Sequence, residues 1–575
     1  MIVEELQKAL QTALKAIGIE APEVNLEHPA ELSHGDYSTN VALASAKLAK
    51  QKPRDIAEKI VAELQKNLPK GVERIDVAGA GFINFHLKKE FFSESVSEVL
   101  RQAQDYGKSK ALVHKKIMVE FTDPNPFKEF HIGHLMDNAI GESVARIFEF
   151  HNANVKRACW QGDVGMHVAK SIWGMQETVK SEKLRSGRRP EVESATAKDW
   201  GKAYAKGSEA FDTDEAVKKE ITALNKVIYE KSDPEVNKLY DSGRKISLDY
   251  FEEIYKRVGT KFDHYFFESK EGVEGKKIVE EFLTKGVFEK SDGAVVFKGE
   301  QYGLHTRVFL NSQGLPTYEA KELGLNKRKF ELEPDLFLSI ILSANEISDY
   351  FKVLLKVMSL VYPPIAAKTK HLAHGFLKLQ TGKMSSRKGN VITGEGLIEQ
   401  VRELVFEKIK ERDMSEMEKE KLAEIVAIGA IKYSILRQAI GGDIIFDFEK
   451  SISFEGDSGP YLQYSYVRAK SVLQKAKDVG IKASVEVRPQ QIALIERLLY
   501  RFPEVVERAG VELEPHYVTT YLTELAGVFN SWYANEKIVD IHDLSSPYKL
   551  VLTEAFATVM KNGLWLLGIK VPEKM

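Results

Sequence analysis

The stretch KKIMVEFTDPNPFKEFHIGHLMDNAIGESVARIFEF (115–150) decides the fold of this chain. It opens with KKIMVEF (115–121), a short β-prone run, and the proline-bearing turn TDPNPFKEF follows. Apolar residues then recur at helical spacing, at Met136, Ile140, Val144 and Ile147. The stretch therefore predicts a strand, a loop and a helix.

The same order is repeated further along the chain. VKRACW (155–160) predicts a second strand, and the loop QGDVG and another helical stretch follow it. This repetition is typical of a parallel α/β sheet, which binds ligands beyond the carboxyl ends of its strands. We expect both loops to lie there. The sheet is predicted to resume with GAVVFKG (293–299), TRVFLNSQGLPTYEAKELGL (306–325) and FLSIIL (337–342).

Three regions differ in pattern, and at 575 residues several domains are expected. Residues 1–108 predict an α+β domain, because a helical run after Pro53 precedes strand-like IDVAGAGFINFHL (75–87). Residues 109–420 predict the α/β domain, with a charged, helical insertion at about 180–290. Long amphipathic stretches predict a helical domain from 421 to 575.

Composition excludes several classes of protein. No run of 18 apolar residues could cross a bilayer, and the first residues do not resemble a secretory signal. The one cysteine, Cys159, excludes internal disulfides and thiolate zinc clusters. We expect a cytoplasmic protein with no membrane association and no metal site. The net charge of −2 does not by itself predict nucleic-acid binding.

A histidine pair stands where the first helix is predicted to begin. His131 and His134 are three residues apart and share a face, and Gly133 lets a flat ring approach the backbone. Helix N-termini favour phosphate, and imidazoles can stabilise charge on an α-phosphate while pyrophosphate leaves. The pattern suits a nucleoside triphosphate. Alone it is weak, since two histidines near a helix start are more often structural.

A second motif, QTGKMSSRKGN (380–390), gathers three cations between glycines that allow the loop to bend. Lys383, Arg387 and Lys388 can close over the β- and γ-phosphates and stabilise the transition state. Alone, a basic loop is more often a solvated surface. Both motifs together, in this order and in an α/β context, indicate nucleotide chemistry.

The two motifs resemble the signatures of class I aminoacyl-tRNA synthetases, and PNPFKEFHIGH (124–134) resembles the arginyl form. HGDYSTNVA (34–42) with AGAGFINFHL (78–87) resembles that family's N-terminal tRNA-elbow domain. SFEGDSGPYLQYSYVRAKSV (453–472) and the ending LWLLGIKVPEKM resemble its helical anticodon-binding domain. The resemblance implies a Rossmann-type catalytic domain that activates L-arginine with ATP and Mg²⁺ and loads tRNA(Arg). No tightly bound cofactor and a monomer are expected.

The resemblance also implies roles for individual residues. ATP would be held by His131, Gly133, His134, Lys128, Met384 and Ser385, and the mobile phosphate loop would comprise Lys383, Arg387 and Lys388. The α-amino and carboxylate groups of the amino acid would lie near Asn125, Gln161 and Asp163. Tyr318 and Glu322, four residues apart, would hold the guanidinium, which a carboxylate can meet with two parallel hydrogen bonds.

The sequence departs from the family pattern at four positions. Ser386 replaces a second lysine, Glu322 a commoner aspartate, Val164 a tryptophan and Ile347 a glutamine. Three alternatives therefore stay open. The chain could be a class I synthetase for another amino acid, a non-catalytic synthetase-like RNA-binding paralogue, or a small nucleotidyltransferase. The last would leave the insertion and the C-terminal domain without purpose.

Overall fold

The computed structural model describes residues 1–20, 23–186, 194–379, 393–489 and 491–575, which form two compact units. One unit contains residues 1–106, 468–502 and 525–559. The other contains residues 107–467, 503–524 and 560–575. Among the residues described, no helix is long and apolar enough to cross a membrane.

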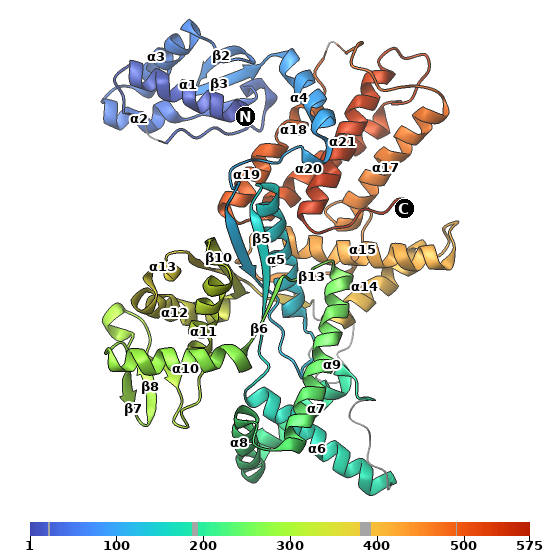
Figure 1. Cartoon of the computed structure of the whole chain (residues 1–575). Coiled ribbons are helices and arrows are strands. Elements are labelled where there is room, and N and C mark those ends of the chain that lie inside the picture. Colours follow the sequence, from blue (N-terminus) through green and yellow to red (C-terminus); the bar gives the residue numbers. More distant parts are fainter. Residues whose placement is uncertain (21–22, 187–193, 380–392, 490) are drawn as a thin grey trace. The chain divides into compact units, whose positions relative to one another are not determined.

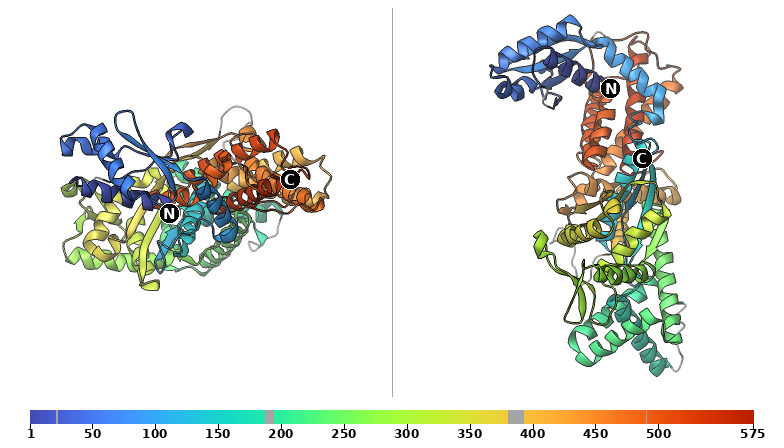
Figure 2. Two further views of the ribbon diagram at one scale, coloured as in Figure 1. Left: turned by 90° about the horizontal axis from the view of Figure 1, so that it is seen from above. Right: turned by 60° about the vertical axis from the view of Figure 1, so that its left-hand side comes forward.

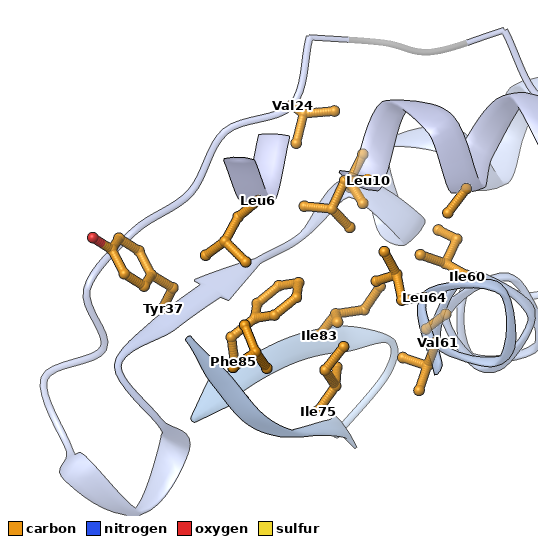
Figure 3. Close-up of a cluster of buried hydrophobic side chains, with 14 of the residues drawn as sticks. Leu6, Leu10, Val24, Tyr37, Ile60, Val61, Leu64, Ile75, Ile83 and Phe85 are labelled. Atoms are coloured by element: carbon orange, nitrogen blue, oxygen red, sulfur yellow. The ribbon is translucent and has the colours of Figure 1, made fainter. Parts of the chain in front are cut away.

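The first unit begins with a three-stranded antiparallel sheet in the order β1-β3-β2. Apolar side chains of the sheet, of α1 and of α3 form one core, in which Leu6, Ile60 and Phe85 are fully buried (Figure 3). The N-terminal α+β prediction therefore matches the elements found. They are α1 (Ile2–Ala16), β1 (Tyr37–Thr39), α2 (Val41–Ala49), α3 (Pro53–Lys66), β2 (Val72–Ala78), β3 (Phe82–Leu87) and α4 (Lys89–Gln102).

The second unit is built on a parallel sheet of five strands in the order β11-β10-β4-β5-β6. From β4 the chain adds β5 and β6 on one side, and from β10 it adds β11 on the other, so the strand order reverses between β4 and β10. Ligands are expected to bind at the carboxyl ends of the strands at such a reversal. The predicted α/β fold is thus confirmed. The strands are β4 (Lys116–Glu120), β5 (Asn154–Gln161), β6 (His264–Phe267), β10 (Leu336–Ala344) and β11 (Thr369–His374).

Helix α5 (Ile132–Phe150) follows β4 and is buried on nearly all sides. Gly141 is required there, because a Cβ at this position would lie 2.2 Å from the Phe121 ring. Ser143 donates a hydrogen bond of 2.9 Å to the carbonyl of Leu566, so the end of the chain covers this helix. A helix that is buried on nearly all sides needs such cover.

In the described part of the insertion, four helices pack against one another (Figure 1; Figure 2, right). Their core contains the buried rings of Trp200 and Phe127. The insertion ends earlier than the predicted 180–290, because β6 joins the central sheet within that range. The pattern missed β6, a strand of four residues flanked by helices. The insertion helices are α6 (Met166–Ser186), α7 (Ala197–Thr213), α8 (Glu215–Glu230) and α9 (Pro234–Val258).

The runs at 293–299 and 306–325 do not continue the central sheet, as the sequence had suggested. They supply β8 (Ala294–Phe297) and β9 (Arg307–Leu310), which pair antiparallel with β7 (Glu289–Ser291) in a separate sheet. The short connections between these strands suit antiparallel pairing, whereas parallel neighbours need a long crossover. The surrounding helices are α10 (Glu268–Thr284), α11 (Tyr318–Leu332), α12 (Ser348–Val361) and α13 (Pro363–Ala366).

The C-terminal region is mainly helical, as predicted. Helix α15 (Glu416–Leu436) runs through the position 420/421 at which the sequence placed a domain boundary. Within the second unit it packs against α5 and α14. The remaining elements are β12 (Leu377–Leu379), α14 (Gly394–Ile409), β13 (Ile444–Phe446), α16 (Phe448–Ser451), α17 (Gly459–Asp478), α18 (Leu494–Leu499), α19 (Phe502–Glu512), α20 (His516–Asn535) and α21 (Ser546–Leu566).

Candidate active site

The histidine pair lies at the N-terminus of α5, as its spacing predicted. The His131 and His134 rings are stacked, with centroids 3.4 Å apart. The backbone N–H of each residue donates to Nδ1 of the other, both at 3.3 Å. A Cβ at Gly133 would lie 2.9 Å from Nδ1 of His131, so glycine keeps this turn open.

Both imidazoles are neutral near pH 7. Burial and the Lys128 ammonium lower the pKa of His131 to about 4, and burial and the His131 ring hold the pKa of His134 well below its ordinary value. Since each Nδ1 accepts a backbone N–H, the ring proton is on Nε2. The pair therefore presents two N–H donors at a helix N-terminus, which is an arrangement that binds phosphate oxygens.

The loop between β4 and α5 carries Asn125 and Lys128 in an unusual backbone conformation. Thr122, Asp123 and Phe127 have φ angles of 80°, 39° and 69°. Left-handed angles at non-glycine residues persist only where surrounding contacts enforce them. The Phe127 ring is buried in the core of the insertion, and its N–H donates to Ser247 Oγ at 2.8 Å.

Lys128 lies beside the histidines, since its charge depresses the pKa of both rings. Its ammonium is 4.4 Å from the ring centroid of Tyr204 on α7, a cation–π contact. Lys128 is thus brought together with His131 and His134 as predicted, and the insertion supplies its aromatic neighbour.

The turn after β5 meets the loop after β4. A Cβ at Gly162 would lie 2.4 Å from Oδ1 of Asn125 and 3.3 Å from Oε1 of Glu268, so the turn and the two side chains are in close contact. Gln161 is buried, and its Oε1 makes no hydrogen bond within the part of the chain that the structure describes. An unsatisfied buried acceptor is costly and marks a place where a ligand donor can bind.

Asp163, in the same turn, is fully buried and held by protein donors. It accepts hydrogen bonds from Tyr240 Oη at 3.0 Å, Arg244 Nε at 2.9 Å, Ser269 N at 2.8 Å and Ser269 Oγ at 2.7 Å. Three of these bonds reach Oδ2 and one reaches Oδ1, so protein donors occupy most of the roughly four acceptor positions of the carboxylate. The structure therefore places Asp163 beside Asn125 and Gln161 but engages it with other residues.

Glu322 lies on α11, where its side chain is almost fully buried. Burial, and next the charge of Glu120, raise its pKa to about 8. Its Oε2 accepts a hydrogen bond of 3.2 Å from Asn326, whereas its Oε1 has no partner among the described residues. A buried carboxyl with one open oxygen is poised to receive a cation.

Tyr318 begins the same helix, one turn before Glu322, so the two residues share one face of α11. Its ring lies 5.2 Å from that of Tyr350 on α12. Burial of its hydroxyl group, followed by the charges of Glu322 and Asp123, holds the pKa of the phenol well above 10, so it stays a neutral donor.

Several charged residues near Glu322 and Tyr318 were not predicted from the sequence. Lys329 forms a fully buried ion pair with Glu120 at 2.7 Å, and Lys321 pairs with Glu268 at 2.5 Å. The signal that could have found Glu120 is its place between Val119 and Phe121 in an apolar strand, since a carboxylate there needs a buried partner. Together with Glu322 and Asp123, the acidic groups outnumber the two lysines.

The second motif lies outside the described residues, namely Lys383, Met384, Ser385, Arg387 and Lys388. The chain that follows it is anchored at the histidines. Thr393 forms an antiparallel bridge with His131, and the N–H of Gly394 donates to the carbonyl of Phe130 at 2.6 Å. The described chain therefore resumes, at the start of α14, in β-type backbone contact with the histidine motif.

Two departures from the family pattern have a structural setting. Val164 is buried in the core of the insertion, which already contains the large rings of Phe127 and Trp200. Ile347 packs against the apolar cluster that includes Phe351 and Tyr350. Both residues contribute to packing beside the site.

Family models match three successive parts of the chain. Residues 4–87 match the arginyl tRNA synthetase N terminal domain, residues 95–448 the catalytic domain of tRNA synthetases class I (R), and residues 462–575 the DALR anticodon binding domain. The catalytic model alone covers more than half of the chain.

Relatives match over nearly the whole length. The chain is 31% identical over 554 residues to the arginine–tRNA ligase of Fusobacterium nucleatum, covering 94% of this chain and 93% of the relative. It is 30% identical over 579 residues to that of Halothermothrix orenii, covering 100% and 99%. Its fold is similar to that of Thermus thermophilus arginyl-tRNA synthetase, with a TM-score of 0.79, 24% identity and 100% of both chains covered.

Proposed function

The chain belongs to the arginyl-tRNA synthetase family of class I, and from this premise we propose that it activates L-arginine with ATP and transfers it to the 3′ end of tRNA(Arg). In the first step an arginine carboxylate oxygen attacks the α-phosphorus of ATP, and pyrophosphate leaves. In the second, a ribose hydroxyl of the tRNA attacks the arginyl carbonyl, and AMP leaves. Mg²⁺ enters with ATP as part of the substrate. Membership of the family speaks against the other substrates and against a small nucleotidyltransferase.

The observation that carries the substrate assignment is the excess of buried carboxylates around Tyr318 and Glu322. Glu120 and Glu268 are each ion-paired with a lysine, whereas Glu322 forms no ion pair among the described residues and its Oε1 accepts no hydrogen bond there. A guanidinium supplies planar donors and a permanent positive charge, so it meets both needs. Binding would favour the ionised form of Glu322, whose pKa of about 8 in the empty pocket reflects burial and the charge of Glu120.

The ATP assignment rests on the α5 N-terminus. The neutral rings of His131 and His134 would each donate Nε2–H to phosphate oxygens, and Lys128 would add a positive charge. These donors are fixed before the reaction, so they stabilise the charge that develops on the α-phosphate without reorganisation. We assign Lys383, Arg387 and Lys388 to the pyrophosphate, with the bridge at Thr393 tethering their segment to the histidines.

For the amino-acid backbone we propose Asn125 and Gln161 as ligands. Both lie at the carboxyl ends of β4 and β5, and the open Oε1 of Gln161 is an acceptor for an α-amino group. We place Asp163 in the same region, as a neighbour of these two ligands. The glutamate at 322 is accommodated because Asn326, one turn further along α11, donates a hydrogen bond to its Oε2.

We assign tRNA binding to both ends of the chain. Residues 1–108 would contact the tRNA elbow, residues 109–420 hold the catalytic site, and residues 421–575 would bind the anticodon, in keeping with the matched anticodon binding domain. We further propose that the enzyme works as a cytoplasmic monomer. Sedimentation at working concentration tests the monomer.

The proposed function is tested by exchange of labelled pyrophosphate into ATP with each amino acid, with and without tRNA. Arginine should support exchange, whereas citrulline, which has the same shape without the charge, should not. A site that accepts citrulline as well as arginine would refute the proposal that Glu120, Glu268 and Glu322 select a positively charged substrate. Absence of exchange with every amino acid, even with tRNA present, would favour the non-catalytic paralogue.

A further inference from the structure

Asp163 is engaged mainly by protein donors, which come from α9 and from the start of α10. Three of its hydrogen bonds reach Oδ2, from Tyr240, Arg244 and Ser269 Oγ, and one reaches Oδ1, from Ser269 N. The side chain is fully buried, and these donors are its hydrogen-bond partners within the described part of the chain. A residue in this state acts on a reaction through what it holds in place.

What it holds on one side is the start of α10. This helix has no side-chain cap of its own, and the N–H of Ser269 in its first turn donates to Asp163 instead. Glu268 directly precedes Ser269, and its carboxylate lies against Gly162 and pairs with Lys321. Asp163 therefore fixes Glu268 at the wall of the amino-acid pocket.

What holds Asp163 on the other side is the insertion. Tyr240 and Arg244 are one turn apart on α9 and reach the same oxygen. The Arg244 guanidinium also stacks on Phe267, 4.0 Å from the ring centroid, which restricts its orientation. Burial and the Asp163 charge raise the pKa of Tyr240, so its hydroxyl stays a donor.

The same helix supports the loop after β4. Ser247, one turn beyond Gly243, accepts the N–H of Phe127, and a Cβ at Gly243 would lie 2.5 Å from the Phe127 ring. One face of α9 therefore contacts the loop after β4, which carries Asn125, and the turn after β5, which directly follows Gln161.

We propose that Arg244 and Tyr240 are positioning residues for arginine activation, which act through Asp163 to fix the turn at Gly162 against Asn125 and Glu268. This inference rests on the proposed function. The insertion is then a structural part of the amino-acid pocket. Loosening this contact misplaces the carboxylate that attacks ATP and leaves the nucleotide contacts intact.

The test compares full-length Arg244→Met with Arg257→Met. Both arginines lie on α9 with closely similar exposure, 25% and 24%, but Arg257 pairs with Glu395, Glu399 and Glu424 of α14 and α15 and not with Asp163. We expect Arg244→Met to lower kcat for arginine-dependent pyrophosphate exchange about tenfold or more, with KM for ATP within about twofold. Arg257→Met should keep the parent's kcat and KM, and Arg244→Lys should recover part of the loss.

Three results would overturn the proposal: parent-like kinetics in Arg244→Met, an equal loss in Arg257→Met, or a parallel rise in KM for ATP. Should Arg244→Met fail to fold, Tyr240→Phe removes a single hydroxyl and should lower kcat about threefold to tenfold, a range set by the value of one hydrogen bond. Unchanged kcat in Tyr240→Phe also counts against the proposal. If the parent itself shows no exchange, the proposed function fails and the positioning role does not arise.

Discussion

The histidine pair (His131 and His134) and the carboxylate pocket (Glu120, Glu268 and Glu322) are both buried clusters of ionisable groups. Burial affects the charge of the two clusters in opposite ways. His131 and His134 give up their protons and become neutral donors. Glu120 and Glu268 keep buried lysine partners, whereas burial, and next the charge of Glu120, raise the pKa of Glu322. The first cluster suits a substrate that brings negative charge, and the second suits one that brings positive charge.

The two clusters also differ in how they are assembled. His131 and His134 contact each other within one helical turn. The carboxylate pocket joins β4, α10 and α11, and Glu120 and its partner Lys329 are 209 positions apart in the chain. The histidine motif can be recognised in the sequence because its residues are near neighbours. The carboxylate pocket forms only when the sheet has brought distant segments together. The predictions below separate the two clusters, from the largest expected effect to the smallest.

Glu322→Gln should have the largest effect, confined to arginine. The amide copies the protonated acid of the empty pocket, so the fold should be retained, but the bound guanidinium loses its counter-charge. Breaking a buried pair costs about 3–5 kcal/mol, which is about 10²–10⁴-fold in arginine affinity. Calorimetric titration with arginine measures it. The control is Glu331→Gln on the same helix, where the side chain is exposed; equal affinity in both variants would disprove the pocket.

His134→Ala should act on the other cluster. Removing one preorganised donor to a developing charge costs about 10²–10³ in kcat. Arginine affinity should stay close to that of the parent. Pyrophosphate exchange and arginine titration on the same preparation give both numbers. A variant that loses arginine affinity as much as kcat would show that the clusters are not separate.

Arginine affinity should rise with pH, and the histidines should not contribute to this pH dependence. Below pH 8 the empty pocket carries a proton on Glu322, and guanidinium binding displaces it, so the association constant should increase by up to about tenfold per pH unit from 6 to 7.5. His131, with a pKa of about 4, contributes no titration in this range. Calorimetry in buffers of different ionisation enthalpy counts the proton released. Glu322→Gln should abolish the slope, and a slope that persists would assign it to another group.

Tyr318→Phe should have the smallest effect. It removes one neutral hydroxyl from the guanidinium pocket and leaves the ring contact with Tyr350 in place. A hydrogen bond of this kind is worth about 0.5–1.5 kcal/mol, so arginine KM should rise about twofold to tenfold, with kcat nearly unchanged. An effect as large as that of Glu322→Gln would make the hydroxyl, and not the carboxylate, the main determinant of specificity.

The local features of this protein could be read from its sequence. The strand, loop and helix at 115–150, the stacked histidines and the shared face of Tyr318 and Glu322 all depend on contacts within a few residues. Periodicity and capping preferences report such contacts directly. The family resemblance then supplied the order of the domains.

What the sequence could not supply was the position of distant segments. It missed β6, and it assigned 293–299 and 306–325 to the wrong sheet, because strand periodicity does not record which strands pair. It also gave no role to Glu120, Glu268, Lys321 and Lys329, or to Tyr240 and Arg244. Each of these is an ordinary charged or aromatic residue until its partner is known.

The sequence by itself therefore determined the α/β fold, the two motifs and the place of the histidine pair at the start of a helix, since all follow from neighbours along the chain. Only the tertiary structure decided that the carboxylates gather where a guanidinium can lie and that Asp163 is bound by α9 and α10. The physical reason is that burial and Coulomb interactions depend on distance in space. A pKa of about 8 at Glu322 arises from its burial and from Glu120, 202 positions away in the chain.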